Sequence, residues 1–147
     1  MVEALHTELI MQLTAPQSPQ LTDFDALRAG LNQFNESVTG PLPRERIASF
    51  VKDEEGRVRG GILGEIKWGW LHIEGLWVDE PIRQDGWGAR LLATLEQAAQ
   101  ARGITRIHLE TTSFQALPFY RKQGYVVFGE LPDMPSGHTS YFLKKQG

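Results

Sequence analysis

The sequence contains no cysteine, no strong excess of charge of either sign and no long hydrophobic run. Without thiols, disulfide bonds, thiolate metal ligands and a covalent cysteine intermediate are all excluded. A formal net charge of −3 argues against nucleic acid or an anionic membrane as the main partner, and it suits a cationic substrate such as an amine. Because Glu3 stands where a signal peptide would carry basic residues, we expect a cytoplasmic protein.

The composition is that of a folded globular protein. The chain has 147 residues, of which 41% are hydrophobic, and it includes four tryptophans and seven phenylalanines. This length suits one compact domain, and no linker, repeat or low-complexity tract divides it, so we predict a single domain over residues 1–147. No spacing of histidines and carboxylates resembles a metal site, and we predict none.

Residues 71–102 organise the rest of the chain. Residues 71–78 form an apolar run interrupted by His72 and Glu74, which predicts a strand with two different faces. Pro81 ends this strand because proline cannot donate to a β-ladder. Leu91, Leu92, Leu95, Ala98 and Ala99 then recur at helical spacing, and Gly103 is expected just past the end of this helix as its C′ residue.

The start of this helix predicts a phosphate site. A helix N-terminus presents free N–H groups, and Gly86 and Gly88 lack the Cβ that would keep a bulky anion away. A P-loop is excluded because no Gly-Lys-Ser/Thr is present. A dinucleotide fingerprint would need a third glycine at Leu91 and a turn directly after the strand, whereas seven residues separate Val78 from Gly86.

What remains is Arg-x-x-Gly-x-Gly, starting at Arg83, and this resembles the acyl-coenzyme A loop of the GNAT (Gcn5-related) N-acetyltransferases. Two downstream segments support the resemblance. Residues 104–112 alternate as a strand, and residues 113–125 resemble the short helix of that family, with Phe119-Tyr120 and the Gly124 that opens the next strand. The resemblance covers residues 47–145.

The resemblance implies an α/β (α+β) fold with a mixed, mostly antiparallel central sheet, helices on both faces, and a splay between the fourth and fifth strands. The predicted strands cover residues 9–13, 47–52, 58–66, 71–78, 104–112, 125–130 and 138–144. A capping box at residues 22–25 predicts a helix start. Phe24, Leu27, Leu31 and Phe34 follow at helical spacing and are predicted to pack on the sheet as core residues.

The implied cofactor is acetyl-coenzyme A as acyl donor. In the family the splayed strand offers backbone amides to the pantetheine arm and thioester, and the matching residues are Leu76, Trp77 and Val78. The positions that match the diphosphate loop are Arg83, Gln84, Asp85, Gly86, Trp87, Gly88 and Ala89. Asp85 departs from the family pattern, which often has a basic residue or a glycine at this position. A carboxylate there should repel a diphosphate by about 1 kcal/mol. Either Asp85 caps the helix, or affinity for the cofactor is modest.

Acetyl transfer to an amine requires a base, since an amine of pKa near ~10.4 is neutral at pH 7 in only about one molecule in 2,500. His72 and Glu74 are two residues apart and therefore share a face of the strand, as does Leu76 unless a bulge near Gly75 shifts the parity. Family members carry bases at these positions. Glu74 is favoured because it would also attract the ammonium, and His72 would act directly or as a relay; both could instead be structural.

Tyr120 matches the tyrosine that in the family helps the coenzyme A thiolate depart. A phenol near pKa ~10 is a weaker acid than a thiol near ~8.5, so full proton transfer to the thiolate is unfavourable. We therefore expect loss of the Tyr120 hydroxyl to slow turnover without abolishing it. A packed tyrosine with a hydrogen-bonded hydroxyl is the alternative. His138 follows Gly137 at the end of a proline-containing loop and is expected to line the acceptor pocket.

These observations predict an N-acetyltransferase that passes an acetyl group directly to a primary amine of a small molecule or peptide, without a covalent enzyme intermediate. One alternative keeps the fold and drops turnover, giving a module that senses acyl-coenzyme A. Another is an enzyme with a different acyl group or a hydroxyl acceptor. A homodimer is possible, and no motif identifies the acceptor.

Overall fold

The computed structural model describes residues 10–147. The chain divides into two compact units, Met1–Pro41 and Leu42–Gly147, and each is described by itself. The prediction of one domain over the whole chain therefore stays a prediction.

The described part of the first unit contains one helix, α2 (Leu21–Thr39), which residues 10–20 precede without regular structure. The predicted strand at residues 9–13 is thus wrong for residues 10–13, and Leu9 lies outside the described residues. The capping box is also wrong, because the helix begins earlier: Gln20 is the N-cap and Thr22 lies inside the first turn. Among residues 10–147, no helix combines the length and apolar character needed to cross a lipid bilayer.

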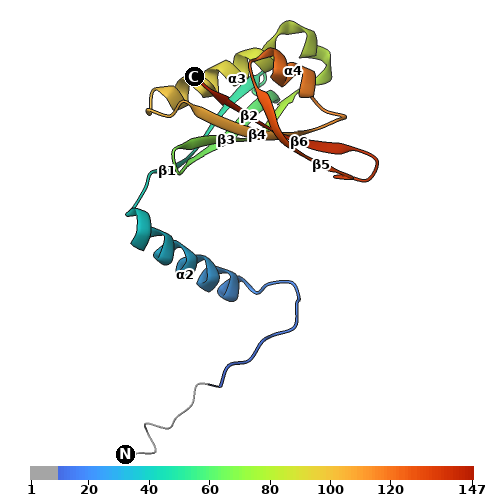
Figure 1. Ribbon diagram of the computed structural model, residues 1–147. Helices are drawn as coiled ribbons and strands as arrows, with labels where there is room; N and C mark the ends of the chain where they lie inside the picture. The colour runs from blue at the N-terminus through green and yellow to red at the C-terminus, as the bar shows by residue number, and fades with distance from the viewer. Residues whose placement is uncertain (1–9) are drawn as a thin grey trace, which may run out of the picture. The chain divides into compact units, whose positions relative to one another are not determined.

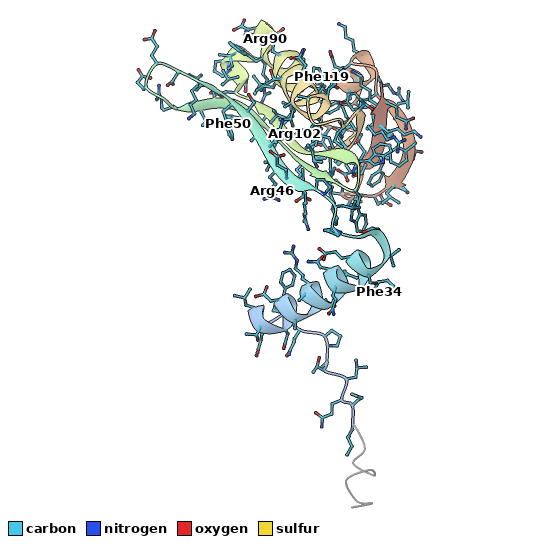
Figure 2. The ribbon with its side chains drawn as sticks, turned by 90° about the vertical axis from the view of Figure 1, so that its left-hand side faces the viewer. Phe34, Arg46, Phe50, Arg90, Arg102 and Phe119 are labelled. Atoms are coloured by element: carbon cyan, nitrogen blue, oxygen red, sulfur yellow. The ribbon has the colours of Figure 1, made fainter. Side chains whose placement is uncertain are left out.

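The apolar side chains of α2 are exposed. Phe24, Leu27, Leu31 and Phe34 retain between 43% and 69% of their accessible surface, and Phe34 is labelled in Figure 2. The prediction that they are core residues is not met, because a single helix offers nothing within its own unit against which to bury an apolar stripe.

The second unit carries the remaining elements. In chain order they are β1 (Arg44–Lys52), β2 (Val58–Lys67), β3 (Trp70–Val78), η1 (Glu80–Asp85), α3 (Trp87–Gln100), β4 (Arg106–Thr112), α4 (Leu117–Lys122), β5 (Val126–Pro132) and β6 (Thr139–Gln146). Apart from the short 3-10 helix η1, each was predicted. Two glycines with positive φ, Gly56 and Gly69, allow the tight turns that join β1 to β2 and β2 to β3.

The strands form one six-stranded sheet in the order β1-β2-β3-β4-β6-β5. Every neighbouring pair is antiparallel except β3 and β4, which are parallel and joined through α3. The predicted mixed, mostly antiparallel sheet is confirmed. Helices on both faces stay a prediction, because α2 belongs to the other unit. Figure 1 shows α3 and α4 on the same face of this sheet. Helix α3 connects β3 to β4, and α4 connects β4 to β5, which runs parallel to β4 on the far side of β6. Two right-handed crossovers that proceed in the same direction along a sheet place their helices on one face.

The hydrophobic core fills the space between that face and the helices. Leu91, Leu92, Leu95 and Ala99 of α3 are buried there at the predicted helical spacing. The sheet contributes Ile62, Ile66, Leu71, Ile73, Ile107, Leu109 and Leu143, and Tyr120 and Tyr125 complete the cluster. The core therefore fixes α3, and with it the helix start at Gly86, against β2 and β3.

A bulge and a splay shape the middle of the sheet. β2 and β3 change register between Leu63 and Gly64, which leaves Glu74 without a partner opposite. A Cβ on Gly64 would lie 2.9 Å from a Leu71 methyl group and 3.0 Å from the His72 carbonyl oxygen, so glycine is required there. β3 and β4 pair only from Leu71 to Ile73, and the strands then part. The bulge moves Leu76 to the face opposite His72 and Glu74.

Candidate active site

A cleft of about 820 Å³ opens where β3 and β4 part. Its walls come from the second half of β3, η1 and the start of α3, the end of β4, and residues 114–120, which lead into α4. The lining residues are Ile73, Glu74, Gly75, Leu76, Trp77, Val78, Arg83, Gln84, Gly86, Gly88, Ala89, Leu109, Glu110, Thr111, Phe114, Gln115, Ala116, Phe119 and Tyr120. The splay predicted from the sequence thus coincides with a cavity of the size that a cofactor occupies.

Most of the predicted cofactor residues line this cleft. Leu76, Trp77 and Val78 come from β3, and Arg83, Gln84, Gly86, Gly88 and Ala89 come from η1 and the start of α3. Asp85 and Trp87 do not line it. Trp87 instead lies under the Arg90 guanidinium, 4.2 Å from the ring centroid. The two predicted positions outside the cleft alternate with the glycines that line it.

The helix start has the form that an anion site needs. Gly86 is the N-cap of α3 and adopts the left-handed conformation, with φ of +78°. No side chain of residues 10–147 caps this end of α3, which excludes the capping alternative for Asp85. The first N–H groups of the helix therefore have no side-chain acceptor, and they border a cleft lined by Gly86 and Gly88.

Arg83 is held close to the cleft by the backbone of β3. Its Nε donates a hydrogen bond to the carbonyl oxygen of Val78 at 2.9 Å. This bond uses only Nε, so the two terminal nitrogens of the guanidinium do not bind that carbonyl. It also fixes η1 against the end of β3. A guanidinium in this position can bind phosphate oxygens through those remaining donors.

Glu74 lies on the bulge and lines the cleft. One carboxylate oxygen accepts a hydrogen bond from Arg46 Nη2 at 3.0 Å, and Arg46 is labelled on β1 in Figure 2. The bulge leaves Glu74 without a strand partner, and its side chain is joined to Arg46 of β1, which lies beyond β2 from β3. Its other carboxylate oxygen is available to a substrate.

Glu110 was not predicted to be a site residue, yet it lines the cleft opposite Glu74. It also accepts a hydrogen bond from His72, with 2.8 Å between Nε2 and Oε2. The signal was present in the sequence: residues 106–112 alternate, and Glu110 faces the same side as His108. Which strand lies beside it could not be read from that alternation.

His72 does not itself line the cleft. It borders a second cavity of about 610 Å³ on the other face of the sheet, together with His108, Trp70, Trp68, Phe128, Glu65, Lys67 and Lys144. The rings of His72 and His108 stack 4.5 Å apart and nearly parallel, at 7°. The hydrogen bond from His72 to Glu110 therefore connects the walls of the two cavities.

His72, His108 and Glu110 also form the one grouping within residues 10–147 whose potential metal ligands come together, all within 4.8 Å. The lone pairs of an imidazole lie in the plane of its ring. In two nearly parallel stacked rings they point along parallel planes and do not converge on one ion. The prediction of no metal site stays a prediction.

Tyr120 lines the cleft from α4 and is only 6% exposed. Burial raises the pKa of its hydroxyl to about 12. Within the described part of the chain, the hydroxyl makes no hydrogen bond, so it is free to interact with a ligand. Full proton transfer to a thiolate of pKa near ~8.5 would be uphill by roughly 5 kcal/mol, more than the ordinary pKa of tyrosine implies.

His138 lies outside both cavities and is exposed. Its ring packs edge-on against Phe114, with centroids 4.8 Å apart, and Phe114 does line the cleft. Nδ1 of His138 is 3.4 Å from Ser113 Oγ. A direct role in acceptor binding stays a prediction, and the contact with Phe114 is the link that the structure provides.

Comparison with known proteins shows which protein family the chain belongs to. A family model described as the Acetyltransferase (GNAT) family matches residues 8–125. Over 105 residues the chain is 40% identical to a blasticidin-S acetyltransferase of Streptomyces morookaense, covering 71% of this chain and 77% of the relative. The chain therefore belongs to the GNAT family and is an acyltransferase.

Solved structures agree with this class. A crystal structure of an acetyltransferase from Bacillus cereus superposes with a TM-score of 0.83 at 35% identity, covering 91% of this chain and 98% of that one. A Bacillus anthracis acetyltransferase solved in complex with acetyl coenzyme A gives a TM-score of 0.62 at 26% identity, covering 69% and 63% of the two chains. GNAT acetyltransferases use acetyl-coenzyme A as acyl donor.

Proposed function

We propose that this acetyltransferase binds acetyl-coenzyme A in the cleft and transfers the acetyl group directly to a primary amine of a small molecule. The observation that carries the proposal is the cleft itself. It runs from an uncapped helix start at Gly86 to Glu74 and Tyr120, at the point where β3 and β4 part. The diphosphate would lie on the helix start, and the pantetheine arm would lie along Leu76 to Val78.

The reacting groups follow from this placement. β3 no longer pairs with β4 beyond Ile73, so the β3 backbone in that region faces the cleft instead of a neighbouring strand. Its amides can orient the thioester carbonyl. The ammonium must lose a proton before it attacks, and Glu74 and His72 are the candidate bases on this strand. Tyr120 donates a hydrogen bond to the departing sulfur.

Two carboxylates at the cleft suit a cationic acceptor. Glu74 and Glu110 both line it, from β3 and β4 respectively. An ammonium placed between them would be attracted by both before it is deprotonated. Together with the 40% identical relative, this makes blasticidin S the first acceptor to examine.

The test combines binding and turnover. Isothermal titration with acetyl-coenzyme A measures cofactor binding, and a thiol-release assay over a panel of amines that includes blasticidin S measures transfer. We expect binding, thiol release with an amine, and a product carrying one added acetyl group. Release with hydroxyl acceptors alone would contradict N-acetylation, and binding without release on every amine would support a sensor.

Direct transfer has its own measurement. The intact protein is mixed with acetyl-coenzyme A in the absence of acceptor, and its mass is recorded. We expect the mass of the protein to stay unchanged, because the cleft-lining residues include no cysteine or serine nucleophile. A protein that gains one acetyl group and passes it to the amine would refute direct transfer.

A further inference from the structure

The hydrogen bond from His72 to Glu110 bridges β3 and β4 at the point where these strands part. Strand pairing ends at Ile73 and Leu109, so the contact reaches diagonally across the opening. Nε2 of His72 and Oε2 of Glu110 are 2.8 Å apart. Because Glu110 lines the cofactor cleft, the imidazole lies one hydrogen bond from the cleft wall.

The other carboxylates near His72 are already engaged. Glu65 lies directly across from His72 on β2, and it forms an ion pair with Arg44 at 3.0 Å. Glu74, two residues along β3, is held by Arg46 at 3.0 Å. Among residues 10–147, Glu110 is therefore the carboxylate that hydrogen-bonds to His72.

This contact selects a tautomer. An ionised carboxylate only accepts hydrogen bonds, so Nε2 of His72 must carry the proton and Nδ1 keeps its lone pair. Within the described residues, Nδ1 has no hydrogen-bond partner. The stacked ring of His108 holds the imidazole plane. Burial is the main cause that lowers the pKa of His108, and the nearby charge of His72 lowers it further. His108 therefore stays neutral while His72 carries a proton.

We propose that Glu110 is a positioning residue for acetyl transfer: it holds His72 as the Nε2–H tautomer, so that Nδ1 accepts the proton lost by the acceptor ammonium. This rests on the proposed function. Because His72 borders the second cavity and does not line the cleft, the proton reaches Nδ1 over a bridging water, and the freed nitrogen lone pair attacks the thioester carbon. The C–N bond forms, the C–S bond breaks, the thiolate leaves, and the imidazolium returns its proton to solvent. Glu110 stabilises the imidazolium in between.

Kinetics of three variants test this assignment. We expect Glu110→Ala to lower kcat by about tenfold or more, with the KM for acetyl-coenzyme A changed less than about twofold. The double variant His72→Gln with Glu110→Ala should be no slower than His72→Gln alone, because Glu110 acts through His72. Effects that multiply, or a change confined to the KM of the amine, would overturn the proposal. Glu130→Gln on β5, far along the sheet order from β3, is the matched control.

A spectroscopic readout does not depend on turnover. With 15N-labelled histidine, long-range 1H–15N spectra of the wild type should show His72 as the Nε2–H tautomer with a slowly exchanging proton. That proton signal should be lost in Glu110→Ala and kept in Glu130→Gln. An Nδ1–H tautomer, or an unchanged signal in Glu110→Ala, would overturn the proposal even if no amine were accepted and the proposed function failed. Activity lost in EDTA and restored by zinc would instead assign the cluster to a metal.

Discussion

Tyr120 and Tyr125 are neighbouring buried tyrosines with opposite hydrogen-bonding environments. Their ring centroids are 5.8 Å apart and both belong to the core. The hydroxyl of Tyr125 donates to Glu96 Oε2 at 2.6 Å, whereas that of Tyr120 has no partner among the described residues and borders the cleft. The same residue type therefore serves stability at one position and is available to a ligand at the other.

Substituting Tyr120→Phe should slow acetyl transfer without abolishing it. We expect kcat to fall about tenfold, equivalent to about 1.4 kcal/mol, because a hydrogen bond to the departing sulfur is lost while proton transfer itself was never complete. With a pKa of about 12, the hydroxyl is protonated throughout the range from neutral to moderately alkaline pH. The ratio of wild-type to variant kcat should therefore stay constant from about pH 7 to about pH 10.

The measurement is steady-state thiol release across that pH range. Tyr141→Phe serves as the control, because Tyr141 does not line the cleft. A loss smaller than about twofold would refute a role for Tyr120 in thiolate departure and favour a packing role.

Tyr125→Phe should destabilise the fold by roughly 1–3 kcal/mol, because the Glu96 carboxylate loses a buried donor and, among residues 10–147, keeps only Lys145, 3.3 Å away. Burial, then the hydrogen bond to Glu96, raises the pKa of Tyr125 above its ordinary value. A raised pKa in the folded state stabilises it below the unfolded pKa of about 10, and this contribution is lost as pH rises further.

Urea unfolding of the wild type and of Tyr125→Phe, from about pH 8 to about pH 11, measures both effects. We expect the difference between the two free energies of unfolding to be largest below about pH 10 and to narrow above it. A difference that grows with pH would show that the sign is wrong. Tyr141→Phe should behave like the wild type, since its hydroxyl has no hydrogen bond within the described residues.

At the level of elements, α3 is flanked by two glycines with positive φ: Gly86 is its N-cap, and Gly103 follows two residues after its C-cap, Ala101. The prediction that Gly103 is the C′ residue is therefore wrong. Gly86 has φ of +78° and Gly103 has φ of +79°, and a Cβ added to either would meet no atom within 4 Å. The two glycines therefore have nearly the same backbone conformation. They differ in their surroundings, because Gly86 lines the cleft and Gly103 does not.

Gly86→Ala and Gly103→Ala form a matched pair that separates backbone strain from cofactor binding. Each should lower the free energy of unfolding by about 1 kcal/mol, because alanine is strained at positive φ. Only Gly86→Ala should also weaken acetyl-coenzyme A binding, by about tenfold, because a methyl group obstructs the approach of the diphosphate to the helix start. Titration calorimetry and thermal unfolding measure the two quantities. Equal affinities in both variants would exclude Gly86 from the cofactor site.

For the whole molecule, the charge balance bears on which acceptor is used. The chain carries a net charge of −3, and Glu74 and Glu110 line the cleft from opposite strands. A field of this sign favours the approach of a cationic amine and is weakened by salt. The cofactor is an anion, so its own salt response must be removed by working at saturating acetyl-coenzyme A.

Under that condition, kcat/KM for a cationic amine should fall severalfold between about 20 mM and about 300 mM NaCl. A weakly basic arylamine, which is uncharged at neutral pH, should show little change in the same assay. Equal salt responses for the two acceptors would mean that the carboxylates do not attract the substrate.

The sequence by itself determined the order of the elements of the second unit, and its resemblance to the GNAT family implied the fold class and about half of the cleft residues. It could do so because hydrophobic periodicity and glycine spacing are local, and the helix start at Gly86, the strand break at Pro81 and the alternation of His72 and Glu74 are all local patterns. The predicted strand at residues 10–13 failed for the complementary reason, since a short apolar run becomes a strand only where a partner strand exists.

Only the tertiary structure decided which side chains meet. The bulge opposite Gly64 turned Leu76 away from Glu74, and the parallel pairing of β3 with β4 brought His72 to Glu110, a residue 38 positions away in the chain. Burial likewise raised the pKa of Tyr120 to about 12. Register, strand adjacency and desolvation depend on contacts between distant segments, and no local pattern in a chain specifies them.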